Sequence, residues 1–146
     1  MRISTKGRYA LRMLVDLAEH RNDGFVALKD IAKRQNISKK YLEQIVPVLN
    51  KSNILQTNRG FQGGYRLAVT PDKCTVGEII RLTEGTLSPI ACIDDDGEVR
   101  CDRSAECATL YVWQGLKEVV TNYLDGITLQ DIIDKKHESY ANDYVI

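Results

Sequence analysis

The stretch at residues 58–67, NRGFQGGYRL, constrains the fold more than any other part of the chain. It follows one short run, 54–57, and leads into a second, 65–69. The apolar and β-branched residues of these two runs predict strands. Its three glycines can reach the positive φ angles of a tight hairpin without a Cβ clash. Arg59 and Arg66 flank these glycines, an arrangement typical of the DNA-reading wing of a winged helix. An ordinary surface hairpin with incidental arginines is the alternative.

The charge of the chain is divided unevenly along its length. The 146 residues have a formal net charge of zero, but residues 1–66 carry +8 and residues 67–146 carry −8. A basic half of this size favours a polyanionic partner, and we expect nucleic acid. The sequence has no run of about 18 apolar residues, and no apolar signal-peptide segment follows Met1. We therefore expect a cytoplasmic protein without a membrane span.

Helical periodicity before the hairpin predicts a helix-turn-helix. Apolar residues recur at helical spacing over 8–20, 28–35 and 39–51, and a tight turn joins the last two segments. Ser38 is the predicted N-cap of the third helix, and Pro47 is expected to strain its interior. The N-terminal end of such a helix meets base edges and phosphates. The residues that we assign to it are Ser38, Lys39, Lys40, Tyr41, Glu43 and Gln44. A small helical bundle with solvated lysines is the alternative.

Three motifs, ISTKGRYAL at 3–11, YLEQ at 41–44 and RGFQGGY at 59–65, resemble those of a bacterial family of winged-helix transcription regulators, the IscR/NsrR/CymR or Rrf-two family. The resemblance implies a homodimer that binds a two-fold symmetric operator in double-stranded DNA. It also implies that Ser38, Tyr41, Glu43 and Gln44 enter the major groove and that Arg59 enters the minor groove. We add Gly60 and Gln62, beside Arg59 in the wing, to the expected DNA contacts.

Three cysteines, Cys92, Cys101 and Cys107, lie in a turn-rich acidic stretch beyond the wing. Their intervals of eight and five residues differ from the paired C-x-x-C of a zinc ribbon, but three thiolates on one loop suit an iron–sulfur cluster. The spacing resembles the cluster-binding loop of IscR and NsrR, with a longer first interval than in IscR. Redox thiols, zinc or no site are the alternatives. We expect the acidic neighbours to raise the thiol pKa values, and we interpret Cys74 as a small buried residue.

The resemblance leaves the fourth cluster ligand open. The histidine of IscR-like members corresponds to Leu110, and the N-terminal aspartate of NsrR-like members corresponds to Arg8. Asp102, Glu106, one of Asp94 to Asp96, a residue of the partner subunit or a small molecule would complete the site. We expect a 2Fe–2S cluster, with 4Fe–4S as the alternative, that is readily lost on purification because protein ligation is incomplete. CymR-like members lack this cysteine set, although the N-terminal half of this chain and its C-terminal residues Tyr144, Val145 and Ile146 resemble them.

The longest predicted helix, about 108–124, has an apolar face too wide for a small winged domain to cover. We interpret it as a dimerisation helix, in agreement with the resemblance, and intramolecular core is the alternative. The residues assigned to the dimer contact are Val112, Trp113, Leu116, Val119, Val120 and Tyr123. A helix at 75–84 is predicted to precede the cysteines, and a short last helix is predicted from Thr128 to Asp134.

These patterns predict a mainly α fold with a small β-hairpin, built as a winged helix-turn-helix plus a long C-terminal dimerisation helix. The expected divisions are 1–70 for DNA binding, 71–88 for a connecting helix, 89–107 for a cysteine-bearing sensor loop, and 108–146 for the dimerisation and C-terminal helices. The predicted function is a repressor, not an enzyme, whose operator affinity is switched by a cluster on the three cysteines.

Two other functions stay open from the sequence. One is a CymR-like repressor controlled by a partner protein or by thiol oxidation, without a cluster. The other is a thiol redox enzyme using Cys92 and Cys101. Against the enzyme stands the lack of a C-x-x-C motif, of a nearby histidine base and of a nucleotide-binding glycine motif.

Overall fold

The computed structural model describes residues 1–144, so the last two residues of the predicted region 108–146 lie outside it. Residues 1–144 form six α-helices and a two-stranded antiparallel sheet. The helices are α1 (Thr5–Glu19), α2 (Leu28–Gln35), α3 (Lys39–Lys51), α4 (Val76–Glu84), α5 (Leu110–Asp125) and α6 (Leu129–Asp143), and the strands are β1 (Leu55–Asn58) and β2 (Gly64–Leu67). The prediction of a mainly α fold with a small hairpin is confirmed.

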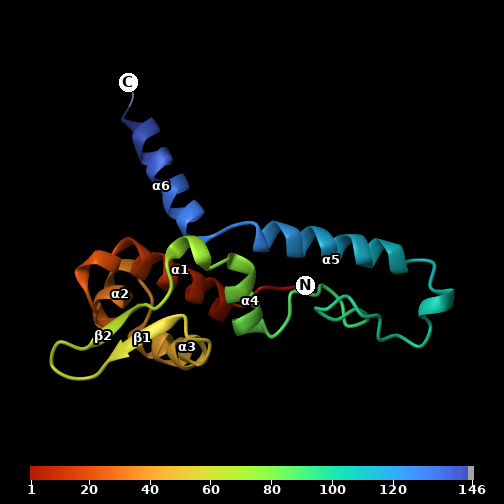
Figure 1. The fold of residues 1–146 in the computed structure, drawn as a ribbon, viewed down its shortest axis with the longest axis horizontal. Coiled ribbons are helices and arrows are strands. Elements are labelled where there is room, and N and C mark those ends of the chain that lie inside the picture. Colours follow the sequence, from red (N-terminus) through yellow and green to blue (C-terminus); the bar gives the residue numbers. More distant parts are fainter. Residues whose placement is uncertain (145–146) are drawn as a thin grey trace.

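Helix α1 is the centre of the winged part of the molecule, and α2, α3 and the hairpin pack around it (Figure 1). Val26, just before α2, extends the two-stranded sheet by one residue. Its N–H donates to the Tyr65 carbonyl and its carbonyl accepts from the Tyr65 N–H, each at 2.8 Å. A Cβ at Gly64 would overlap the Val26 carbonyl, so glycine is required there. The base of the wing is thereby fixed to the segment that leads into α2.

Hydroxyl side chains begin four of the helices. Ser4, Ser38, Thr75 and Thr128 each accept a hydrogen bond from the backbone N–H three residues later, at 3.1 to 3.2 Å. These bonds satisfy N–H groups that have no partner within their own helix. The predicted caps Ser38 and Thr128 are confirmed, and α3 continues through Pro47 to its end at Lys51.

The main hydrophobic core lies under the winged domain and includes residues from later in the chain. Cys74, Ile79 and Leu129 belong to the same buried cluster as the core residues of α1 and α3. The Leu129 N–H donates to the Cys74 carbonyl at 3.0 Å, which fixes the start of α6 to this core. Burial raises the pKa of the Cys74 thiol to about 12, in agreement with its interpretation as a buried residue.

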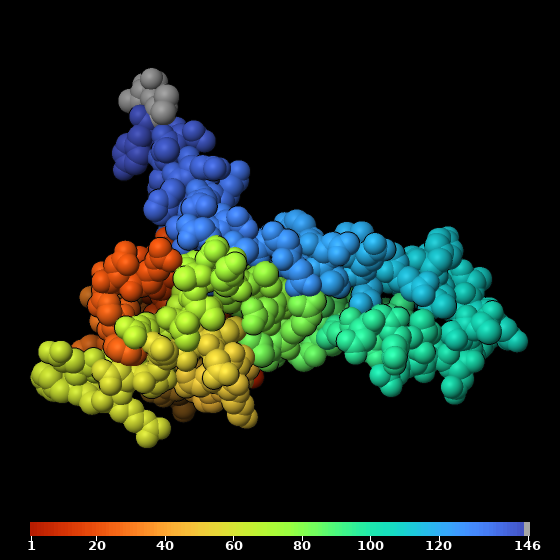
Figure 2. Space-filling view, in the orientation of Figure 1, coloured from red at the N-terminus to blue at the C-terminus, as the bar shows by residue number. Residues whose placement is uncertain are grey.

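Helices α5 and α6 extend away from this core in different directions. Figure 1 shows α5 and the cysteine loop as an arm on one side of the winged domain, and α6 as a separate projection that carries the C-terminus. The arm and the projection are also distinct in the space-filling view (Figure 2). At the base of the arm, Leu124 and Ile127 pack against a second small cluster of Val76, Ile80 and Leu87.

The last helix is longer than predicted. It was expected to end at Asp134, but α6 continues to Asp143. Lys136, in the middle of α6, forms an ion pair with Glu19 of α1 at 2.7 Å, which ties the first half of α6 to the winged domain. Among residues 1–144, no helix is both long enough and apolar enough to cross a membrane.

Candidate nucleic-acid interface and cysteine loop

The N-terminal end of α3 presents the polar surface predicted for DNA recognition. Its apolar stripe, Leu42, Ile45, Val46 and Leu49, is buried, so the opposite side of the helix faces outward. Five of the six residues predicted at this end, Ser38, Lys39, Lys40, Glu43 and Gln44, are exposed, and Tyr41 is half-buried. All six therefore lie together, with hydrogen-bonding groups directed toward solvent.

Tyr41 is half-buried because its ring packs edge-on against Tyr9 of α1, with the ring centroids 5.4 Å apart. It also lines a cleft of about 480 Å³ together with Arg2 and Arg8. Sequence reasoning did not assign these two arginines to the site, because their position beside α3 depends on how α1 packs. Two positive charges next to the start of α3 suit a DNA phosphate.

Glu43 already has a partner on α3. Its carboxylate lies 3.7 Å from the Lys39 ammonium one turn earlier, and both side chains are exposed. Such a pair contributes at most about 1 kcal/mol in water. Glu43 can therefore exchange Lys39 for an amino group on a base edge, such as N4 of cytosine, at little cost.

The tip of the wing lies between Asn58 and Gly64, which face each other across the two strands. Among the three wing glycines, positive φ is found at Gly60, at 125°. At Gly63 the requirement is space, because a Cβ there would overlap the carbonyl oxygen of Asn58. The predicted contact residues Arg59, Gly60 and Gln62 are exposed in this turn. Glycine is thus needed in the wing for two different physical reasons.

The two wing arginines have different roles. The Arg66 guanidinium lies 4.5 Å from the centre of the Phe25 ring, and its Nε donates to Gln56 at 2.7 Å. These contacts join β2 to β1 and to the segment before α2. No side-chain hydrogen bond or ion pair engages Arg59 within residues 1–144. Arg66 supports the hairpin, while Arg59 is available to a ligand.

A buried carboxylate connects α1 to the end of α2. Asp16 is 1% exposed and accepts hydrogen bonds from Arg34 at 2.6 and 3.0 Å and from the Gln35 side chain at 2.9 Å. Burial by itself raises the pKa of Asp16, but the hydrogen bonds from Arg34 and Gln35 and the charge of Arg34 outweigh it and leave the pKa below its ordinary value. This network positions the turn that leads into α3.

The cysteine loop is folded through its own acidic residues. Asp94 accepts from the backbone N–H of Glu98 at 2.9 Å and from Nε of Arg100 at 2.8 Å. Asp95 accepts from the Thr86 hydroxyl and the Leu87 N–H at 2.8 and 2.9 Å. These two carboxylates, considered as fourth ligands, are therefore already engaged in hydrogen bonds within and beside the loop.

The three cysteines of the loop are not joined in disulfides, and Cys92 is exposed while Cys101 and Cys107 are half-buried. Their donor chemistry suits an iron–sulfur cluster. The geometry does not, because within residues 1–144 no three Cys, His, Asp or Glu side chains lie close enough together to hold a metal ion. In this conformation the loop is not a preformed metal site.

The expectation that acidic neighbours raise the thiol pKa values is wrong for Cys107. The Thr109 hydroxyl, 3.4 Å from its Sγ, and the backbone N–H groups of Thr109 and Leu110 lower the pKa of this thiol. These groups lie at the start of α5, where donors without a helical partner favour a thiolate.

The predicted apolar row on α5 is on the surface of the protomer. Val119 and Tyr123 are 66% and 67% exposed, and Val112 and Leu116 are also exposed. Trp113 and Val120, in the adjacent row, are half-buried. The cysteine loop lies against another side of the helix, where the Lys117 ammonium donates to the Asp95 carbonyl at 2.8 Å. The exposed row thus has no cover from the protomer itself.

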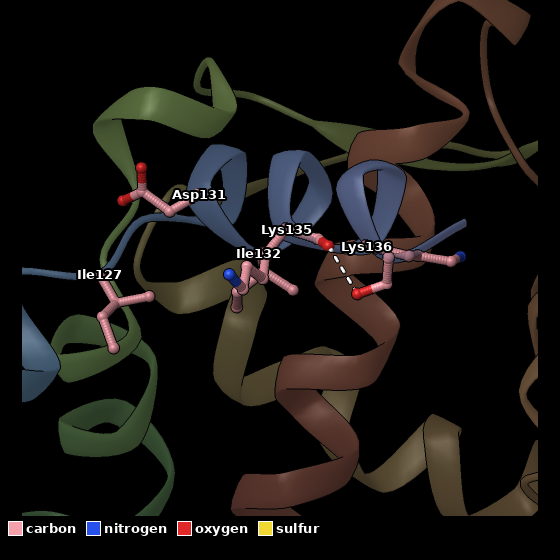
Figure 3. A pocket seen from close by; sticks show the side chains of 6 residues that line it. Ile127, Asp131, Ile132, Lys135 and Lys136 are labelled. Carbon is pink, nitrogen blue, oxygen red and sulfur yellow. Dashed lines mark hydrogen bonds between the residues drawn. The ribbon is translucent and has the colours of Figure 1, made fainter. Parts of the chain in front are cut away.

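A second apolar surface lies where α5 gives way to α6. Ile127 and Ile132 line a groove of about 430 Å³ whose rim includes Lys135 and Lys136 (Figure 3). Ser139, whose hydroxyl donates to the Lys135 carbonyl at 3.1 Å, also lines the groove. The groove and the exposed row of α5 are both apolar surfaces outside the winged domain.

Comparison with known proteins gives one consistent result. The family model for Rrf2, described as an iron-dependent transcriptional regulator, matches residues 3–135. The HTH-type transcriptional regulator CymR of Bacillus subtilis (strain 168) is 38% identical over 143 residues, which cover 96% of this chain and 97% of CymR. The solved structure of B. subtilis CymR, described as the global cysteine regulator, has a TM-score of 0.75 at 37% identity and covers 92% of this chain and 98% of that one. The structure of T. potens IscR has a TM-score of 0.75 at 39% identity and covers 95% of this chain and 90% of that one.

Proposed function

This chain belongs to the Rrf2 family of transcriptional regulators, and from that premise we propose that it is a homodimeric repressor that binds a two-fold symmetric DNA operator in the bacterial cytoplasm. The observation that carries the proposal is the pairing of an exposed polar helix end with an adjacent wing. Helix α3 contacts β1, and both lie along the same edge of the winged domain (Figure 1).

The dimensions of B-DNA suit this pair of elements. The major groove admits an α-helix, so the start of α3 supplies the base contacts, with Gln44 suited to adenine and Glu43 to cytosine. Ser38, Lys39, Lys40 and the Tyr41 hydroxyl contact phosphates or base edges next to them. Arg59, carried by the wing, enters the adjacent minor groove, where arginine is favoured by the negative potential.

The dimer is proposed from the exposed row of α5. Val112, Leu116, Val119 and Tyr123 form one stripe along the helix, and pairing this stripe with its two-fold copy removes it from water. Trp113 and Val120 would then pack at the edge of the same contact. A two-fold dimer presents two copies of α3, which explains why we expect an operator with two-fold symmetry.

DNA binding is tested with duplexes that the full-length protein selects from a random pool, followed by fluorescence anisotropy. For 6 to 10 phosphate contacts, we expect affinity to fall about 10³ to 10⁵-fold between 50 and 200 mM salt. We expect Arg59→Ala to weaken binding about tenfold. Arg103→Ala, which removes the same charge from the cysteine loop, is the matched control. Selected sequences without two-fold symmetry, or equal binding by Arg59→Ala, would contradict the proposal.

The signal is proposed to act through the three thiols of the loop, with an iron–sulfur cluster as the occupant. Support comes from the donor chemistry of Cys92, Cys101 and Cys107 and from the iron-dependent description of the family. The sulfur atoms are not grouped in this conformation, so binding would require the loop to rearrange. The loop leads directly into α5, so its order would influence the helix that joins the two subunits.

Anaerobic production with iron and sulfide analysis tests this assignment. Cluster-bound wild-type protein is expected to be coloured. The variants Cys92→Ala, Cys101→Ala and Cys107→Ala are each expected to lack this colour. Cys74→Ala, which removes a thiol outside the loop, is expected to keep it. A colourless, iron-free wild-type protein would reject the cluster.

The alternative is a repressor without a cluster, controlled by a partner protein or by thiol oxidation. It is favoured by the similarity to CymR and by the ungrouped sulfur atoms. It predicts that a variant with all three loop cysteines replaced by alanine binds the operator as the wild-type protein does, whether or not iron is supplied. A thiol enzyme is not proposed, because the relatives are transcriptional regulators.

A further inference from the structure

The side chain of Phe61 lies at the end of the wing with an exposed fraction of 103%. The protein therefore gains no burial from this ring. Figures 1 and 2 show the segment between β1 and β2 extending beyond the rest of the winged domain. A single exposed apolar residue is common on protein surfaces, so exposure alone assigns no role. The surroundings of Phe61 decide what it can contact.

Those surroundings are largely polar, and on one side Phe61 lines a groove of about 370 Å³ that also includes Phe25, Asp30 and Arg34. The exposed neighbours of Phe61 in the turn are Asn58, Arg59, Gly60 and Gln62. A docking surface for another protein would combine several exposed apolar side chains, whereas Phe61 is the one large apolar side chain exposed in this turn and lies two residues from Arg59. Residues 1–66 as a whole carry a charge of +8. This combination fits a polyanion whose interior is apolar and flat, which is the chemistry of stacked base pairs in DNA.

The wing also holds the ring on a stiff support. The Gly63 N–H donates to the Gly60 carbonyl at 3.0 Å, which closes the turn around Phe61. At the other end of the hairpin, Tyr65 is hydrogen-bonded to Val26 at 2.8 Å in both directions. A side chain that separates stacked bases must resist being pushed back, and these bonds at both ends of the wing provide that resistance.

From these observations we propose that Phe61 is an apolar wedge that inserts between two base pairs from the minor groove and bends the operator. The proposal rests on the DNA-binding function proposed above. Minor-groove proteins combine arginine contacts with apolar side chains that partly unstack a base step and kink the duplex. Arg59 supplies the first element and Phe61 the second. Because pyrimidine–purine steps unstack most easily, Phe61 selects such a step under each wing.

The test uses full-length protein and its selected duplex, with 2-aminopurine placed in turn at each step of the flanks. We expect the wild-type protein to increase 2-aminopurine fluorescence at one step per half-site and to retard circularly permuted fragments as bent DNA does. Phe61→Ala is expected to abolish the fluorescence change and to lower affinity about tenfold. Phe61→Leu, which keeps an apolar wedge, is expected to retain part of the fluorescence change and part of the affinity.

One control and two possible outcomes separate the wedge from a folding defect and from a failure of DNA binding. The thermal midpoint of Phe61→Ala should equal that of the wild-type protein, because the ring is fully exposed. If the wild-type protein binds its duplex and Phe61→Ala matches it in affinity, fluorescence and bending, the wedge is rejected while DNA binding stands. If the wild-type protein selects no DNA, the proposed function fails and the wedge fails with it. If Phe61 instead binds a partner protein, Phe61→Ala will match the wild-type protein in DNA affinity, fluorescence and bending, and the wedge is rejected.

Discussion

The two terminal nitrogens of Arg81 each donate a hydrogen bond of 2.7 Å to a different oxygen of Asp125, the last residue of α5. Arg81 lies on α4, which packs against α1, so this ion pair joins the α5 arm to the winged domain. The hydrogen bonds from Arg81 lower the pKa of Asp125 and keep it charged. The direction of α5 relative to α3 is set in part at this contact.

Gly77→Ala is expected to break this contact. A Cβ at Gly77 would overlap an oxygen of Asp125, so the carboxylate has to leave Arg81. We expect a loss of about 1–3 kcal/mol in the free energy of unfolding by urea, typical of forcing an atom into a filled space. Without the clash, the same change in a helix would stabilise the protein by about 0.5–1 kcal/mol.

A double variant provides the control for this prediction. In Asp125→Ala the overlapping carboxylate is absent, so Gly77→Ala should cost less there than in the wild-type protein. Such non-additivity is the sign of direct interaction between two positions. An equal cost in both backgrounds would contradict the contact.

Acid is expected to weaken the link between α1 and α2. The pKa of Asp16 is below its ordinary value in the folded protein, so its stabilising effect is complete above about pH 4 and is lost as the pH falls through the folded pKa. Urea unfolding between pH 7 and pH 2 measures this loss. Asp16→Asn is expected to be less stable than the wild-type protein at pH 7 and to lose less stability on acidification. Parallel pH profiles for the two proteins would exclude this role.

Val119→Glu is expected to convert the proposed dimer into monomers. The new charge would be buried against its two-fold copy, where it has no partner, and burying an unpaired charge costs several kcal/mol. Gln114→Glu adds the same charge to α5 on the side away from the apolar row and should leave the dimer intact. Sedimentation velocity distinguishes the two species. A monomeric wild-type protein, or a dimeric Val119→Glu, would show that α5 is not the interface.

In metal-free, reduced protein, Cys107 is expected to react with iodoacetamide faster than Cys74. The lowered pKa of Cys107 increases its thiolate fraction at pH 7.5, whereas burial raises the pKa of Cys74 to about 12. Peptide mass spectrometry over time measures both rates. Thr109→Val removes the hydroxyl beside Cys107 and should slow its alkylation, while Thr121→Val, further along α5, should not. Unchanged reactivity in Thr109→Val would mean that the hydroxyl has no effect on the thiol.

The helices that were predicted well are defined by residues within or next to their own segments. Helix α2 was expected at 28–35 and α3 at 39–51, because an apolar stripe and the cap at Ser38 define them within the segment itself. The start of α4 is similarly marked by Thr75 and its end by Gly85, which has the positive φ of a helix C-cap.

The features that were not predicted depend on contacts between distant residues. The residues of α6 beyond Asp134 are polar and without apolar periodicity, so the predicted helix ended there, and the ion pair between Lys136 and Glu19 cannot be seen in the sequence. Arg2 and Arg8 reach the recognition surface only through the packing of α1 beside α3. The use of Asp94 and Asp95 inside the loop depends instead on how the loop itself folds, which no regular spacing in the sequence indicates.

The burial of Leu129 beneath the winged domain affects the order in which a new chain becomes functional. The recognition helix is complete at Lys51, but the core that supports it lacks Leu129 until α5 has been synthesised. A chain terminated early, before α5, would therefore lack a filled core as well as a dimer surface. Incomplete translation products of this protein should consequently be degraded rather than compete with the full-length regulator for DNA.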